Sequence, residues 1–309
     1  MPEEITFYSK REIICPVCNT PFKREDLLTG RGRLNAGELT NELRRMYIST
    51  QKYGDINPLI YPITVCPNCY YASEKEDFTK ISSKTAERLA DLRSVRAQYV
   101  MKIFGYVPDF FEKRDLVAGI ASYIFAISSY SVFEKKKFSP TVKCGVASLR
   151  AAWLFGDLFR ESQNTVYQEL SEVFYRKAAD FYTIALQNQY NGKEGLDYAN
   201  WLGPDTDYNF GYDGFLYICG ILRYKNTVYI EDPYEKIRVY EEVKRTLSKV
   251  FGMGRRAKDK PQILLDLARD VYDKIGEEVG ELKSSLEGGG GAVDSETETE
   301  EIFTEENQS

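Results

Sequence analysis

Two cysteine pairs of equal spacing are the residues of this chain best suited to chemistry. They lie in Cys15-Pro16-Val17-Cys18 and in Cys66-Pro67-Asn68-Cys69. One CxxC turn lets two thiolates reach the same ion, and two such turns complete the tetrahedral shell that structural zinc prefers. The 309 residues contain no histidine, so four thiolates are the only complete set of nitrogen and sulfur ligands. We therefore predict one Zn²⁺ bound by Cys15, Cys18, Cys66 and Cys69.

A shell of four sulfur ligands is closed, because no position remains for a substrate. We expect the metal to be structural and to stabilise the fold by roughly 10 kcal/mol, as it does in zinc-finger peptides. Two disulfides, a CxxC redox pair and iron–sulfur ligation remain alternative interpretations of the four cysteines. We call each CxxC turn a knuckle. Two knuckles without a surrounding βαβ pattern are not typical of a thioredoxin-like site.

Composition favours a folded protein of the cytoplasm. Hydrophobic residues make up 43% of the chain, which is enough to bury a sizeable core. No run approaches 18 apolar residues, so we expect no membrane insertion. The first residues lack the basic and apolar regions of a signal peptide, and the cysteines are spaced for a metal. These features predict a reducing, cytoplasmic location.

The net charge of −6 is unevenly distributed along the chain. Residues 287–309 hold eight acidic side chains and no basic one, which leaves 41 basic and 39 acidic side chains elsewhere. A near-neutral body provides no strong field for nucleic acid, so such a partner is not expected. Arg31 and Arg33, which flank Gly32, are the remaining candidates for a phosphate contact.

The N-terminal part, residues 1–80, is predicted to be a zinc-ribbon-like β element. Segments 5–14 and 57–65 are β-prone and each leads into a knuckle, and 21–23 suggests a return strand. The polar insert at 24–60 is expected to loop out between the half-sites. Within it, we predict a short helix at 38–46.

The chain from 81 to 286 is predicted to be helical, which makes the protein mainly α. Apolar periodicity and Gly/Pro boundaries indicate helices near residues 83–104, 112–134, 140–161, 164–190, 212–225, 233–251 and 261–284. Ala178, Tyr182 and Ala185 fit the second-helix signature of a tetratricopeptide repeat, so we predict tetratricopeptide-like hairpins in an α-solenoid. An irregular helical bundle is the alternative. The acidic tail, 287–309, is predicted to be disordered.

Candidates for partner binding lie in two loops. The loop before the fifth helix is rich in aromatic side chains, a type that often anchors interfaces; these are Trp201, Tyr208, Phe210 and Tyr212. The same residues could instead fill a gap between two helical hairpins. Arg255 and Arg256, in a Gly-rich basic loop, are candidates for an acidic partner. Cys144 and Cys219 lie in apolar stretches and are expected to be buried.

The knuckles and helical motifs together resemble an uncharacterised bacterial family, domain of unknown function 2225. The residues that carry the resemblance are Cys15-Pro16-Val17-Cys18, Phe22, Arg31, Arg33, Tyr47, Asn57-Pro58-Leu59-Ile60-Tyr61, Cys66-Pro67-Asn68-Cys69-Tyr70-Tyr71-Ala72, Leu149-Arg150-Ala151-Ala152-Trp153 and Ala178 to Ala185. The resemblance implies a bacterial cytoplasmic protein with a metal knuckle and a helical half, and implies no reaction.

The residue after each CxxC departs from the usual zinc knuckle. That position tends to need a positive φ and is often glycine, but here it holds Asn19 and Tyr70. Asparagine tolerates this conformation better than most residues, whereas tyrosine does not. The second knuckle is therefore predicted to be strained or differently shaped.

The sequence favours a non-catalytic zinc-binding adaptor whose helical domain binds a partner protein. The missing histidine removes the usual general base, and no catalytic constellation replaces it, so an enzyme is disfavoured. A redox or zinc sensor acting through the four cysteines is the first alternative. A nucleic-acid-binding zinc ribbon is the second.

Overall fold

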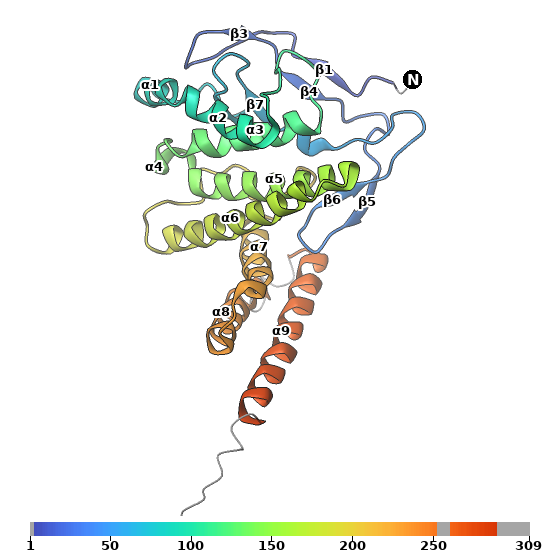
Figure 1. Cartoon of the computed structure of the whole chain (residues 1–309), viewed down its shortest axis with the longest axis vertical. Coiled ribbons are helices and arrows are strands. Elements are labelled where there is room, and N and C mark those ends of the chain that lie inside the picture. The colour runs from blue at the N-terminus through green and yellow to red at the C-terminus, as the bar shows by residue number, and fades with distance from the viewer. Residues whose placement is uncertain (1–2, 252–259, 289–309) are drawn as a thin grey trace, which may run out of the picture.

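Short antiparallel ribbons form the N-terminal part of the chain, and helices form the rest (Figure 1). The computed structural model describes residues 3–251 and 260–288. Within them, four two-stranded ribbons pair β1 (Thr6–Tyr8) with β4 (Glu25–Leu27), β2 (Ile13–Ile14) with β3 (Pro21–Phe22), β5 (Ala36–Leu39) with β6 (Arg45–Tyr47), and β7 (Ile63–Val65) with β8 (Ala72–Glu74). The predicted mainly helical chain with a small N-terminal β element is confirmed.

The expected strand at 57–65 is shorter than the sequence indicated. Pro58–Ile60 forms a 3₁₀ turn, η1, because Pro58 sets the turn and the Asn57 side chain accepts a hydrogen bond from the amide of Leu59. The strand itself begins only at Ile63.

The predicted helix at 38–46 is wrong, because this segment is the β5–β6 hairpin. Its tip is a tight turn in which the Thr40 hydroxyl accepts hydrogen bonds from the amides of Glu42 and Arg44. Leu43 adopts a left-handed φ of 61° and is fully buried. Local side-chain bonds of this kind compete with helix formation.

Nine α-helices lie in the described residues, namely α1 (Ser83–Asp91), α2 (Arg93–Phe104), α3 (Leu116–Tyr130), α4 (Lys135–Phe138), α5 (Pro140–Ser162), α6 (Thr165–Tyr190), α7 (Gly211–Asn226), α8 (Pro233–Phe251) and α9 (Gln262–Gly288). The one predicted helix at 83–104 is split by a break at Leu92. The helix predicted at 112–134 is shorter at both ends and forms α3. Its N-terminus is set by Asp115, whose side chain caps the helix. The last five predicted helices are confirmed, as α5 to α9. The acidic tail lies almost wholly outside the described residues.

Consecutive helices pack on one another along the chain. α3, α5 and α6 form successive layers beneath the ribbons, and α7 to α9 lie on the far side of α6 (Figure 1). Gly145 permits the close approach of α5 and α6, since a Cβ there would lie 2.8 Å from the Tyr182 ring. No helix among the described residues is long and apolar enough to span a membrane.

The tip of the β5–β6 hairpin is buried against the helices, contrary to the expectation that the insert loops out. The Glu42 carboxylate accepts hydrogen bonds from the Trp153 indole and the Tyr175 hydroxyl, and it pairs with Lys225. These three partners lie on α5, α6 and α7, so one carboxylate ties three helices to the insert.

A second ion pair holds the same hairpin. Both terminal nitrogens of the Arg44 guanidinium donate to the Asp157 carboxylate, at 2.9 and 2.5 Å. Asn57 donates to the same carboxylate at 2.8 Å. Bidentate pairs of this kind fix orientation as well as adding energy.

Replacing Glu42 with alanine should therefore destabilise the protein strongly. The change leaves the Trp153 and Tyr175 donors without an acceptor, and we expect the free energy of unfolding to fall by about 3 kcal/mol. Urea denaturation followed by circular dichroism measures the effect. Glu38→Ala is the matched control, because Glu38 is exposed on the same hairpin and should change stability by less than about 0.5 kcal/mol. Equal midpoints for both variants would contradict the structural role of Glu42.

Candidate metal centre

Each cysteine pair lies at the turn of its own β-hairpin, and the two turns have the same hydrogen bonds. In the β2–β3 turn, the amide of Cys15 donates to the Thr20 carbonyl at 3.0 Å and the amide of Asn19 donates to the Cys15 carbonyl at 2.9 Å. In the β7–β8 turn, the amides of Cys66 and Tyr70 make the equivalent bonds at 2.8 and 2.9 Å. The two half-sites anticipated from the sequence are therefore two similar knuckles.

Tyr70 adopts the left-handed conformation that its position requires. Its φ is 58°, the same value as that of Asn19 in the first knuckle. A left-handed residue other than glycine costs roughly 1–2 kcal/mol. The Tyr70 ring stacks on Phe125 of α3 at a centroid distance of 5.2 Å, a contact that offsets this cost. The second knuckle is thus not differently shaped.

The four sulfur atoms converge on one point. Their Sγ atoms all lie within 4.8 Å of one another, and the pairs across the knuckles, Cys15–Cys69 and Cys18–Cys66, are separated by 3.6 and 3.5 Å. A tetrahedron with metal–sulfur bonds of about 2.3 Å has sulfur atoms about 3.8 Å apart. All six cysteines of the chain are free thiols, so the structure contains neither of the two disulfides considered as an alternative.

Burial and mutual hydrogen bonding make it costly to ionise several of these thiols at once. Cys15, Cys66 and Cys69 are buried, and Cys18 is partly exposed. Hydrogen bonds from Cys15 and Cys69 lower the pKa of Cys66, whereas the bond to Cys66 raises the pKa of Cys15 to about 12. A single thiolate therefore disfavours ionisation of its neighbours. Only a cation can hold four thiolates in this small volume.

Arg96 of α2 provides a test of whether a metal fits this donor set. Its guanidinium is fully buried, and one terminal nitrogen donates to the Cys69 carbonyl at 3.0 Å. The other terminal nitrogen and Nε have no partner among the described residues. A divalent ion with four thiolates carries a net charge of −2, half of which a guanidinium beside it compensates. The orphaned donors and the four sulfur atoms thus fit a bound metal ion.

Polar side chains around the cluster link both knuckles to α2. The Cys18 thiol donates to the Thr20 hydroxyl at 3.2 Å, and the Asn68 amide donates to the same oxygen at 3.0 Å. Arg93 then donates to the Asn68 side chain at 3.0 Å. Such partners orient metal ligands and are usually as important as the ligands themselves.

Arg96 was not singled out from the sequence, although a signal was present. In the helix predicted at 83–104, it falls on the apolar stripe between Leu89 and Val100, where a charged residue is unexpected. A charge on a buried helix face implies a partner of opposite charge.

The predicted partner-binding aromatics are not grouped around the cysteines. Tyr208 and Tyr212 are exposed, Phe210 is buried against α7, and the partly buried Trp201 donates to the Asp205 carbonyl. The two tyrosines therefore lie on the surface, whereas Trp201 and Phe210 are closer to the alternative role of filling a gap between helices. Arg255 and Arg256 lie outside the described residues.

The two arginines considered for phosphate contact are differently placed. The Arg33 guanidinium lies 4.9 Å from the centre of the Tyr53 ring and donates to the Gly30 carbonyl, whereas Arg31 is exposed. Cys144 and Cys219 are buried, as expected.

Replacing Arg96 with methionine should weaken metal binding while leaving all four ligands in place. Loss of the compensating charge is expected to lower zinc affinity by about 10–100-fold, the range typical of residues around a metal shell. Competition with a chromogenic chelator measures this. Lys102→Met, on the exposed face of α2, is the control and should match the wild type. An unchanged affinity in Arg96→Met would refute the charge-compensating role.

Comparison with known proteins agrees with the resemblance drawn from the motifs. The sequence profile of a family described as an uncharacterized protein conserved in bacteria, domain of unknown function 2225, matches residues 8–275. An uncharacterized protein of Borreliella burgdorferi is 41% identical over 283 residues, which cover 91% of this chain and 100% of that protein. No solved structure matches the chain. With cysteines at all four knuckle positions and a profile match over most of its length, the chain belongs to this bacterial family.

Proposed function

We propose that this protein is a non-catalytic, zinc-stabilised scaffold of the cytoplasm that binds a partner protein through its helical half. The observation that carries the proposal is the closed cluster of four sulfur atoms, three of them buried, with the Arg96 guanidinium beside it. One Zn²⁺ in this cluster would have all its ligands from the protein, which is typical of a structural site.

The role of the zinc follows from the distance between its ligands in the sequence. The ion would join two hairpins whose nearest ligands, Cys18 and Cys66, have 47 residues between them, and so close a long loop. Closing long loops removes conformational entropy from the unfolded chain. Because the insert between the knuckles holds three helices through Glu42, the ion would also fix the position of that contact.

The helical half supports the partner-binding part of the proposal. Consecutive helices from α5 to α9 pack on one another, and Ala178, Tyr182 and Ala185 are buried in α6 as the tetratricopeptide signature requires. We interpret this order as a tetratricopeptide-like solenoid, a type of fold that presents an extended binding surface.

An exposed group of tyrosines is the partner site that we propose. Tyr208 and Tyr212 are 50% and 42% exposed, and Tyr190 at the end of α6 is 57% exposed. Lys249 of α8 donates to the Tyr190 hydroxyl at 2.6 Å. Rigid aromatic side chains with a cation nearby are typical of the residues that dominate interface energies.

A redox or zinc sensor is the second candidate, because one ligand, Cys18, is partly exposed. Its sulfur lies 3.5 Å from that of Cys66, so oxidation would begin there and release the ion. The other three sulfur atoms are buried, which favours the structural role.

Native mass spectrometry with and without mild peroxide separates the two candidates. The scaffold proposal expects one Zn²⁺ per chain that survives mild peroxide, because oxidant reaches only one of four sulfur atoms. Cys66→Ser should abolish the bound zinc, and Cys219→Ser, at a buried position away from the knuckles, should leave it in place. Loss of zinc with formation of a disulfide would favour the sensor, and absence of zinc would overturn both candidates.

The tyrosine surface is tested by binding to a purified partner. The partner is first identified by crosslinking the tagged full-length protein in its own cells, and its binding is then measured with both proteins pure. We expect Tyr208→Ala combined with Tyr212→Ala to weaken binding by about 2 kcal/mol or more. Tyr234→Ala, at a 68% exposed tyrosine on α8, is the control and should bind normally. Full affinity in the double variant would place the interface elsewhere.

A further inference from the structure

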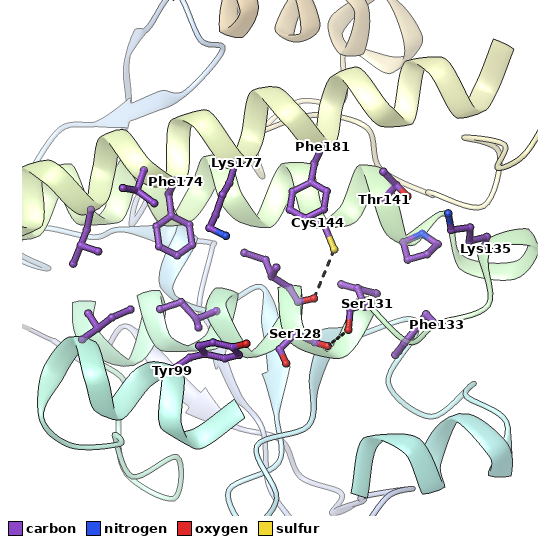
Figure 2. A pocket seen from close by; sticks show the side chains of 17 residues that line it. Tyr99, Ser128, Ser131, Phe133, Lys135, Thr141, Cys144, Phe174, Lys177 and Phe181 are labelled. Atoms are coloured by element: carbon purple, nitrogen blue, oxygen red, sulfur yellow. Dashed lines mark hydrogen bonds between the residues drawn. The ribbon is translucent and has the colours of Figure 1, made fainter. Parts of the chain in front are cut away.

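A large, mostly apolar trough lies between α3 and α6 in the helical half. It has a volume of about 530 Å³, its walls are formed by α2, α3 and α6, and α5 lies at its floor (Figure 2). This volume lies within the range of about 300–1,000 Å³ that is typical of small-molecule sites. We call it the α3–α6 trough.

The trough is long and narrow. On α6, it is lined by Leu170, Phe174, Lys177 and Phe181, which recur on one face of the helix. These four positions span twelve residues, or about 16 Å along the helix axis. Ile127 of α3 forms part of the opposite wall. An elongated, mostly apolar channel suits an unbranched chain better than a compact ring system.

One end of the trough is apolar and closed by aromatic rings. Phe174 packs on Phe155 with ring centres 5.3 Å apart, and Phe155 packs on Phe104 at 6.1 Å. Tyr167 completes this group at 6.2 Å from Phe104. Leu170, Val173 and Phe174 make the α6 wall of the trough apolar at this end.

The other end is polar, and a lysine projects from the middle of the α6 wall. Ser131, Lys135 and Thr141 gather at the polar end, whereas Lys177 points into the space between the helices from between Phe174 and Phe181 (Figure 2). Lys135 lies 4.0 Å from Glu194, whereas Lys177 makes no ion pair with the described residues. None of the seventeen residues that line the trough is acidic. The trough is therefore complementary to a ligand with an apolar body and an anionic end.

We propose that the α3–α6 trough binds a single unbranched aliphatic carboxylate, a fatty acid. The chain lies along α6 among the apolar residues of the trough, and its carboxylate pairs with the ammonium group of Lys177. The inference does not depend on the partner-binding proposal, because the tyrosine surface lies on other residues. Binding is reversible and involves no covalent step.

Isothermal titration calorimetry of the full-length, zinc-loaded protein tests the proposal with dodecanoate below its micelle concentration. We expect one dodecanoate per chain. Dodecanol, which has the same chain but no charge, should bind at least tenfold more weakly, and Lys177→Gln should weaken dodecanoate binding about tenfold. Ser128→Phe places a ring in the trough and should abolish binding.

The matched control is Lys136→Gln, which removes an exposed lysine next to Lys135 but outside the trough. It should bind dodecanoate as the wild type does. Lys177 is exposed, so its variant reports on binding even where Ser128→Phe fails to fold. Absence of dodecanoate binding, equal affinity for dodecanol, or full affinity in Lys177→Gln would each overturn the proposal. A dimer that Ser128→Phe dissociates, without dodecanoate binding, would assign the trough to a second copy of the chain and would overturn it too.

Discussion

Convergence of four thiols from two distant hairpins is the constraint on which the N-terminal half depends. One hairpin has two paired residues on each strand and the other has three, so both are too short to be stable alone. Their sulfur atoms lie within 4.8 Å of one another in a largely buried position. Hydrogen bonds from Cys15 and Cys69 lower the pKa of Cys66, and the pKa of Cys15 is raised because Cys15 is the donor to that thiolate and a second charge beside it would be repelled. A divalent ion would remove that repulsion, and Arg96 would balance part of the charge that remains. The four cysteines, an ion bound by them and the guanidinium would therefore form one electrostatic unit.

Buried ion pairs fix how the N-terminal ribbons pack against the helices. Glu42 and Arg44 lie at the tip of one hairpin and pair with groups on α5, α6 and α7. Lys143 of α5 is also buried and pairs with Asp77, which follows β8 and accepts a hydrogen bond from Tyr130 of α3. Buried charges contribute little net stability but are costly to leave unpaired. These pairs therefore specify one arrangement of the two halves rather than simply adding to its stability.

Features with a local signature could be predicted from the sequence, and features created by distant partners could not. The CxxC spacing located the four-cysteine cluster, and apolar periodicity located α5 to α9, because both signals lie within a few residues. The sequence wrongly predicts a helix for the β5–β6 hairpin, since Glu42 at its tip is fixed by side chains more than a hundred residues away. Tyr70 was expected to distort its knuckle, yet a stacking contact with Phe125 supports it. The α3–α6 trough has no local signal, because it exists only where two helices are held apart on α5.

The metal cluster and the α3–α6 trough share two helices, although they lie on different faces of them. On α2, Arg96 contacts the second knuckle, while Tyr99 and Ile103 line the trough. On α3, Phe125 supports Tyr70, while Ile124 and Ile127 line the trough. The helices that contact the four-cysteine cluster therefore also hold one wall of the trough in place. The tyrosine surface has different supports, because α7 packs mainly on α6 and α8. Loosening of the knuckles thus acts first on the trough. It reaches the tyrosine surface through the insert, where Glu42 contacts the helices and Arg45 pairs with Asp207 next to Tyr208.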